Sequence, residues 1–91
     1  MIFNAQELTQ TVRGTVVDSE SQVPVPYASI AVITLDPALG TSSDKEGVFR
    51  IKNVPTGRHE IHISCIGYEK QIIPELMISS SKEIVLNVKL K

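Results

Sequence analysis

The chain has 91 residues, and its nine lysines and arginines against ten aspartates and glutamates give a formal net charge of −1. This length supports one small domain and leaves no room for a second hydrophobic core. The charge balance excludes a predominantly electrostatic nucleic-acid binder, and no apolar run approaches the roughly 18 residues that a membrane helix requires. The single cysteine excludes an internal disulfide.

The apolar residues are mostly β-branched. Valine and isoleucine together number 21 and threonine six, whereas leucine, alanine and methionine together number 12. β-branched side chains fit a pleated surface well and are crowded in a helix. The composition therefore predicts an all-β domain.

Residues 1–10 are predicted to be an N-terminal extension ahead of a domain over 11–91. The first six residues are too short and too polar for a complete signal peptide. Their apolar pair, followed by Ala5 and Gln6, resembles the end of a signal peptide around its cleavage point. We therefore expect the chain to derive from an exported protein.

Seven strand-like segments then follow, with turn signals between them at the spacing of a β-sandwich and no helical segment. In chain order they cover residues 11–18, 27–34, 41–43, 48–52, 58–66, 68–73 and 83–90. Side chains of successive residues alternate between the two faces of a strand. This alternation predicts an inward face made of Val12, Gly14, Val16, Ala28, Ile30, Val32, Phe49, Ile51, His59, Ile61, Ile63, Cys65, Ile84, Leu86, Val88 and Leu90.

Turn residues separate these segments. Asp44 is expected to accept backbone N–H groups of its own turn, and Gly47, Gly57 and Gly67 to supply the conformations that tight turns need. The stretch 23–27 carries two prolines that cannot donate to a ladder, which predicts an extended edge or lead-in rather than a central strand.

Several of these motifs, in order, resemble the carboxypeptidase regulatory-like domain family. They are the runs 12–18 and 25–30, the turn 40–49 (GTSSDKEGVF), and the segments 53–57 and 66–68. The resemblance implies a transthyretin-like, seven-stranded Greek-key β-sandwich. It also implies a non-catalytic accessory module, of the kind found at the N-terminus of TonB-dependent outer-membrane receptors and other exported bacterial proteins.

The residue types that form catalytic or metal sites in other proteins are not grouped into such a site in this sequence. His59 and His62 are three apart, and an odd offset on a strand sends them to opposite faces, so they cannot share a metal ion. Cys65 has no base within reach to activate it and is expected to pack as a small apolar residue. The segment 42–47 lacks the bidentate glutamate and flanking helices of an EF-hand. We therefore expect no enzyme activity, no cofactor and no metal.

Binding to another protein fits the sequence best. A sandwich has open edges that accept a partner strand, and the short polar edge at Thr41, Ser42 and Ser43 is the expected docking place. Tyr27 and Tyr68 are further candidates for contact. The expected partner is another domain of the parent protein or a periplasmic protein, on the periplasmic side of the outer membrane or at the cell surface. A module that binds glycans or peptides is the alternative.

Overall fold

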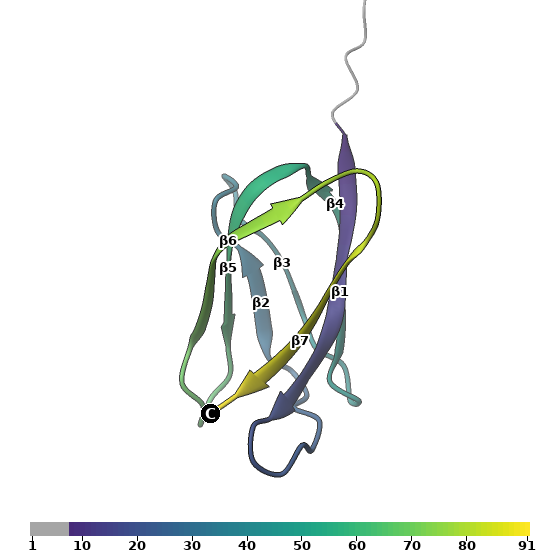
Figure 1. The fold of residues 1–91 in the computed structure, drawn as a ribbon. Helices are drawn as coiled ribbons and strands as arrows, with labels where there is room; N and C mark the ends of the chain where they lie inside the picture. Colours follow the sequence, from purple (N-terminus) through teal and green to yellow (C-terminus); the bar gives the residue numbers. More distant parts are fainter. Residues whose placement is uncertain (1–7) are drawn as a thin grey trace, which may run out of the picture.

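The chain folds into two packed β-sheets, and the computed structural model describes residues 8–91. The seven strands are β1 (Thr9–Asp18), β2 (Ser29–Val32), β3 (Leu39–Ser42), β4 (Val48–Pro55), β5 (Gly57–Ser64), β6 (Gln71–Ile78) and β7 (Ile84–Leu90). One sheet has the order β4-β1-β7 and the other β3-β2-β5-β6 (Figure 1). The prediction of an all-β, seven-stranded sandwich is confirmed. None of residues 8–91 forms a helix that is long and apolar enough to span a membrane.

The expected signal-peptide remnant lies outside the described residues. Strand β1 begins at Thr9, so Thr9 and Gln10, assigned above to the extension, pair with Pro55 and Val54 of β4.

The core fills the space between the sheets with the side chains that alternate inward. Its largest fully buried members include Phe49, Ile30, Ile61, Ile63 and Leu90. Leu86 and Ile84, near the open edge of the three-stranded sheet, are only partly buried. Period-two patterning with one face toward the core is therefore the main determinant of this fold.

The first and last strands are parallel neighbours. Strand β7 pairs with β1 from Val12 opposite Ile84 to Asp18 opposite Leu90. Gly14 makes this approach possible, because a Cβ built on it would lie 1.9 Å from the carbonyl oxygen of Leu86.

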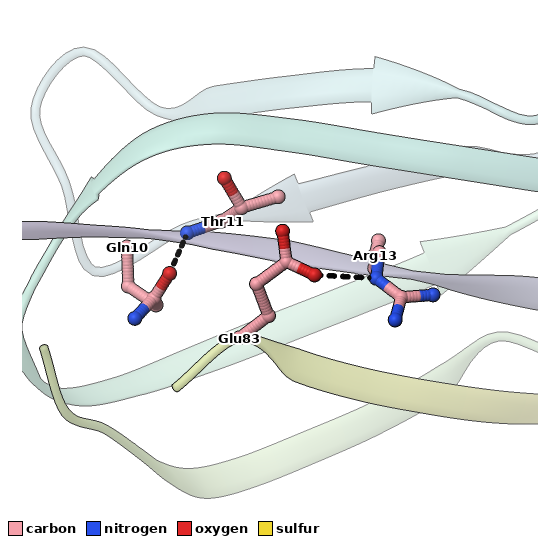
Figure 2. Close-up of polar contacts among 4 residues, drawn as sticks. All are labelled: Gln10, Thr11, Arg13 and Glu83. Atoms are coloured by element: carbon pink, nitrogen blue, oxygen red, sulfur yellow. Dashed lines mark hydrogen bonds and ion pairs between the residues drawn. The ribbon is translucent and has the colours of Figure 1, made fainter. Parts of the chain in front are cut away.

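The chain crosses from one sheet to the other between β4 and β5, at residues 53–57, which were predicted as a turn. The register between β1 and β4 shifts between Gln10 and Val12, and Asn53 has a positive φ of 61°. The bulge leaves Thr11 outside the register, and the Oε1 of Gln10 accepts its backbone N–H at 2.9 Å (Figure 2). The backbone N–H of Thr11 is thus satisfied by a neighbouring side chain, and the bulge lets β4 bend toward the second sheet.

Two predicted strands differ most from their bounds in the structure. The segment expected at 27–34 is a strand only over Ser29–Val32, because Tyr27 has a φ of 61° and lies in a turn. The segment expected at 68–73 is displaced to Gln71–Ile78 and runs through Pro74. Proline is tolerated there because β6 is an edge strand and its register with β5 shifts at this point.

One end of the sandwich gathers most of the turns, and we call it the turn end. It comprises the β1–β2 loop (19–28), the β3–β4 turn (43–47), the β5–β6 turn (65–70) and Lys91. Backbone hydrogen bonds tie these parts together, from Ser19 N to Leu90 O and from Glu69 N to Lys91 O. In Figure 1 the turn end is at the bottom, where the chain also reaches its C-terminus.

Candidate interaction site at the turn end

The first element of the site is the turn Val25–Pro26–Tyr27–Ala28. Proline at the second position and a positive φ at the third are the marks of a type II β-turn, whose third residue is usually glycine or asparagine. Here that residue is Tyr27, with a φ of 61° and 69% of its surface exposed. A left-handed backbone costs a residue with a Cβ about 1–2 kcal/mol, so this tyrosine is held out into solvent at a cost in stability.

Ser43 holds this turn in place. Its hydroxyl stands between the ends of the turn, where it accepts the N–H of Ala28 and donates to the carbonyl of Val25, both at 2.8 Å. Its backbone carbonyl accepts the N–H of Tyr27, and its N–H donates to the carbonyl of Ala28, both at 2.9 Å. Ser43 is 2% exposed, so the proposed docking role for its side chain is wrong. It is a structural residue beneath the turn.

The second element is the turn Cys65–Ile66–Gly67–Tyr68. The N–H of Tyr68 donates to the carbonyl of Cys65 at 3.1 Å, and Gly67 has a φ of 91°. This is again the arrangement of a type II turn, with glycine in its usual place. The second position is Ile66, whose side chain is fully exposed.

The sheet brings the two turns together. Ser29, just after the first turn, pairs with Ser64, just before the second. A shallow hollow of about 420 Å³ is lined by Tyr27, Ser29, Ser64, Cys65 and Ile66, which we call the tip patch. It combines an aromatic ring and an aliphatic side chain with two small hydroxyls. Such a surface is suited to binding and carries no acid–base pair for catalysis.

Tyr68 does not join the tip patch. It is half-buried, and its hydroxyl donates to the Oδ2 of Asp18 at 2.9 Å. Backbone N–H groups of Ser21 and Glu20, together with the Tyr68 hydroxyl, lower the pKa of Asp18 below its ordinary 3.8. The same bond to Asp18 raises the pKa of Tyr68 above 10.0. This pair fastens the end of β1 to the β5–β6 turn.

The other turn residues lie at both ends of the molecule. The Oδ1 of Asp44 accepts the N–H groups of Glu46 and Val48 at 2.9 Å, and Gly47 in the same turn has a φ of 75°. Gly57, with a φ of 130°, is the first residue of β5, at the opposite end. Of the remaining docking candidates, Thr41 is half-buried and Ser42 exposed, both on the edge strand β3.

The two histidines lie on opposite faces of β5. His59 is 7% exposed, and its Nε2 lies 2.7 Å from the carbonyl of Pro55 while its Nδ1 lies 2.7 Å from the hydroxyl of Thr34. Because a carbonyl only accepts, Nε2 carries the proton and Nδ1 accepts from Thr34. His62 lies on the outer face, with its Nε2 2.6 Å from Glu60. Among residues 8–91 no group of three or more side chains is placed to hold a metal ion.

Sequence reasoning missed Ile66. Cys65, predicted on the inward face, follows the end of β5, where it is half-buried, packs against the core and also lines the tip patch. The available signal was Gly67, because a glycine at the third position of a type II turn puts the preceding residue, Ile66, at the second position of that turn and outside the strand.

Comparison with protein families gives one match. The family model of the carboxypeptidase regulatory-like domain matches residues 11–91. No curated protein sequence matches the chain.

Solved structures share the fold at low sequence identity. A Bacteroides uniformis protein provisionally described as carbohydrate binding has a TM-score of 0.73 and 13% identity, over 90% of this chain and 41% of its own. A type II cohesin–X–dockerin complex from Acetivibrio cellulolyticus has a TM-score of 0.70 and 19% identity, over 89% of this chain and 56% of its own. BcpA, the major pilin subunit of Bacillus cereus, has a TM-score of 0.71 and 17% identity, over 90% of this chain and 29% of its own. The chain thus spans between 29% and 56% of the length of these structures.

Proposed function

Because the chain belongs to the carboxypeptidase regulatory-like domain family, we propose that it is a non-catalytic interaction module of an exported bacterial envelope protein. The module would contact a protein partner, either another domain of its parent or a periplasmic protein, and hold the parent's working domain at a fixed distance.

The tip patch is the observation that carries this proposal. Tyr27 keeps a strained backbone conformation while most of its side chain is exposed, and Ile66 beside it is fully exposed. Backbone strain and exposed apolar surface both lower stability or solubility. Their coincidence at one end of a well-packed sandwich supports a role in contact with a partner.

The absence of catalysis is supported by how the reactive side chains are engaged. Both ring nitrogens of His59 are engaged within the protein, and His62, on the opposite face of β5, pairs with Glu60. A nucleophile needs a base within hydrogen-bond reach. The described residues offer Cys65 no such neighbour in their hydrogen bonds.

The setting we propose is the N-terminal region of a TonB-dependent outer-membrane receptor or a similar surface protein. The family resemblance supports this setting, and the likeness to a pilin subunit supports the coarser expectation of a place at the cell surface. An antibody against the domain, used on fractionated cells of the source bacterium, tests it. We expect a membrane-associated band far larger than this chain, and a cytosolic band would contradict the proposal.

Site-specific crosslinking tests the contact. The photoreactive residue p-benzoylphenylalanine would replace Tyr27, Ile66 or, as a control, Met77, which is exposed near the opposite end of β6. Irradiation of intact cells should give a crosslinked protein band from positions 27 and 66 and none from position 77. Equal crosslinking from all three positions, or none from 27 and 66, would contradict a partner at the tip patch.

A glycan- or peptide-binding module is the second candidate. The exposed ring of Tyr27 beside the hydroxyls of Ser29 and Ser64 favours it, since aromatic rings stack on the apolar faces of sugars. Titration of ¹⁵N-labelled protein with a glycan panel distinguishes the two candidates. Amide shifts confined to the tip patch would favour glycan binding, and a flat response would favour the protein partner.

A further inference from the structure

Two arginines face each other on the outer surface of the three-stranded sheet. Arg13 of β1 and Arg50 of β4 are directly opposite in the antiparallel register. Like charges at directly opposed positions destabilise a sheet. Nothing in the folding of the sandwich requires this pair, because both side chains point away from the core.

Among residues 8–91, Arg13 is the only one of the two arginines that makes an ion pair, and this pair uses one of its five N–H donors. The Nε of Arg13 donates to the Oε2 of Glu83 at 2.7 Å. Figure 2 shows the two terminal nitrogens of Arg13 directed away from Glu83. Within residues 8–91, Arg50 makes no ion pair. A guanidinium has five N–H donors, so most donors of the pair remain available to a second carboxylate.

The surface around the arginines is basic and partly apolar. A hollow on this face is lined by Arg13, Thr15, Val48, Arg50, Val85 and Asn87. Val48 and Val85 are each more than two-fifths exposed. By strand alternation Lys52 and Lys89 share the face, so among residues 8–91 four cations stand beside the carboxylate of Glu83, in a chain whose net charge is −1. We call this surface the basic face.

We propose that the basic face binds an extended acidic peptide segment of a partner protein, at a site separate from the tip patch. Carboxylates two residues apart in an extended segment lie about 7 Å apart. Arg50 and Lys52, two residues apart on β4, repeat the same spacing, and Val48 and Val85 can receive the apolar side chains of such a segment. A row of cations at strand spacing matches a peptide better than the single phosphate of a lipid headgroup.

The test is a titration of the ¹⁵N-labelled 91-residue chain with a peptide of alternating glutamate and threonine. We expect amide shifts at Arg13, Val48, Arg50 and Val85, weakening as salt is raised because exposed charges are screened. Arg50→Gln should weaken binding about five-fold, in the range of an exposed ion pair. Lys45→Gln removes the same charge from the β3–β4 turn and should leave the affinity unchanged, as should Tyr27→Gly at the tip patch.

Three results would overturn the proposal. The first is equal weakening by Arg50→Gln and Lys45→Gln, which would indicate attraction by net charge alone. The second is equal shifts with a peptide in which lysine replaces glutamate. The third is binding to vesicles containing phosphatidylglycerol without binding to the peptide, which would assign the face to a membrane. Because Arg50 is exposed and lies opposite Arg13, thermal unfolding of Arg50→Gln should give a midpoint equal to that of the parent chain or slightly higher, which confirms that the variant is folded.

Discussion

The N–H of Tyr27 donates to the carbonyl of Ser43 at 2.9 Å, so a buried serine fixes the backbone of the most exposed aromatic residue in the described part of the chain. The serine hydroxyl completes the same turn by bridging Val25 and Ala28. The geometry of the tip patch therefore depends on one side chain beneath it.

Ser43→Ala should destabilise the domain by about 2–3 kcal/mol, because it leaves a buried N–H and a buried carbonyl without their partner. Urea unfolding measures this loss. Ser42→Ala is the matched control, since Ser42 is exposed at the end of β3, directly before Ser43, and it should stay within about 0.5 kcal/mol of the parent. Equal effects of the two variants would contradict the role given to Ser43.

Tyr27→Gly should leave the domain as stable as the parent or slightly more stable, because glycine adopts a positive φ without strain. Tyr27→Ala removes the same ring but keeps a Cβ at a φ of 61°, and it should be about 1 kcal/mol less stable than Tyr27→Gly. Urea unfolding of both variants measures the difference. If alanine were the more stable replacement, Tyr27 would not be strained in solution.

Asp18 should make stability depend on pH at the acid end. Hydrogen bonds from Ser21, Glu20 and Tyr68 lower its pKa in the folded state below the 3.8 of the unfolded chain. The unfolded state therefore binds the proton first, and the contribution of Asp18 is fully present above 3.8 and lost as the pH falls below it. Urea unfolding between pH 7 and pH 2 measures this loss.

Asp18→Asn is the control for that series. The variant should be less stable than the parent at pH 7, and the difference should shrink as the pH falls below 3.8. Tyr68 adds a second check at the alkaline end. Its pKa is raised above 10.0, so its contribution is present below 10.0 and lost as the pH rises beyond that value. A difference between parent and Asp18→Asn that stayed constant with pH would contradict this account.

His59→Ala should cost about 2–4 kcal/mol, because it opens a cavity and leaves the carbonyl of Pro55 without its donor. His62→Ala, on the outer face of the same strand, should cost less than about 1 kcal/mol. Thermal unfolding compares the two. Long-range ¹H–¹⁵N spectra should find the proton of neutral His59 on Nε2, and a proton on Nδ1 would contradict the hydrogen bonds described.

Sequence patterning predicted the sheets well because alternation is a local property. Val12, Val16, Ile30 and Phe49 were placed inward by period two alone, and all are buried. The turn at Tyr27 could not be predicted in this way, since its conformation depends on Ser43, a residue of another segment.

Strand β6 escaped prediction for a similar reason. Local rules end a strand at Pro74, and only the edge position and the shifted register with β5 make that proline acceptable. The basic face likewise emerges only once β1 and β4 are paired, because Arg13 and Arg50 are distant in sequence and opposite in space.

The parallel pairing of β1 and β7 has a mechanical consequence. Strand β1 starts far from the turn end and β7 finishes at it (Figure 1). A pull applied between Thr9 and Leu90 would slide the two strands past one another, so that all the bonds from Val12–Ile84 to Asp18–Leu90 bear the load together instead of opening one by one. The close approach of Gly14 to Leu86 lies within this paired stretch of β1 and β7. The domain is thereby built to resist being stretched along its long axis, which is what a spacer under tension requires.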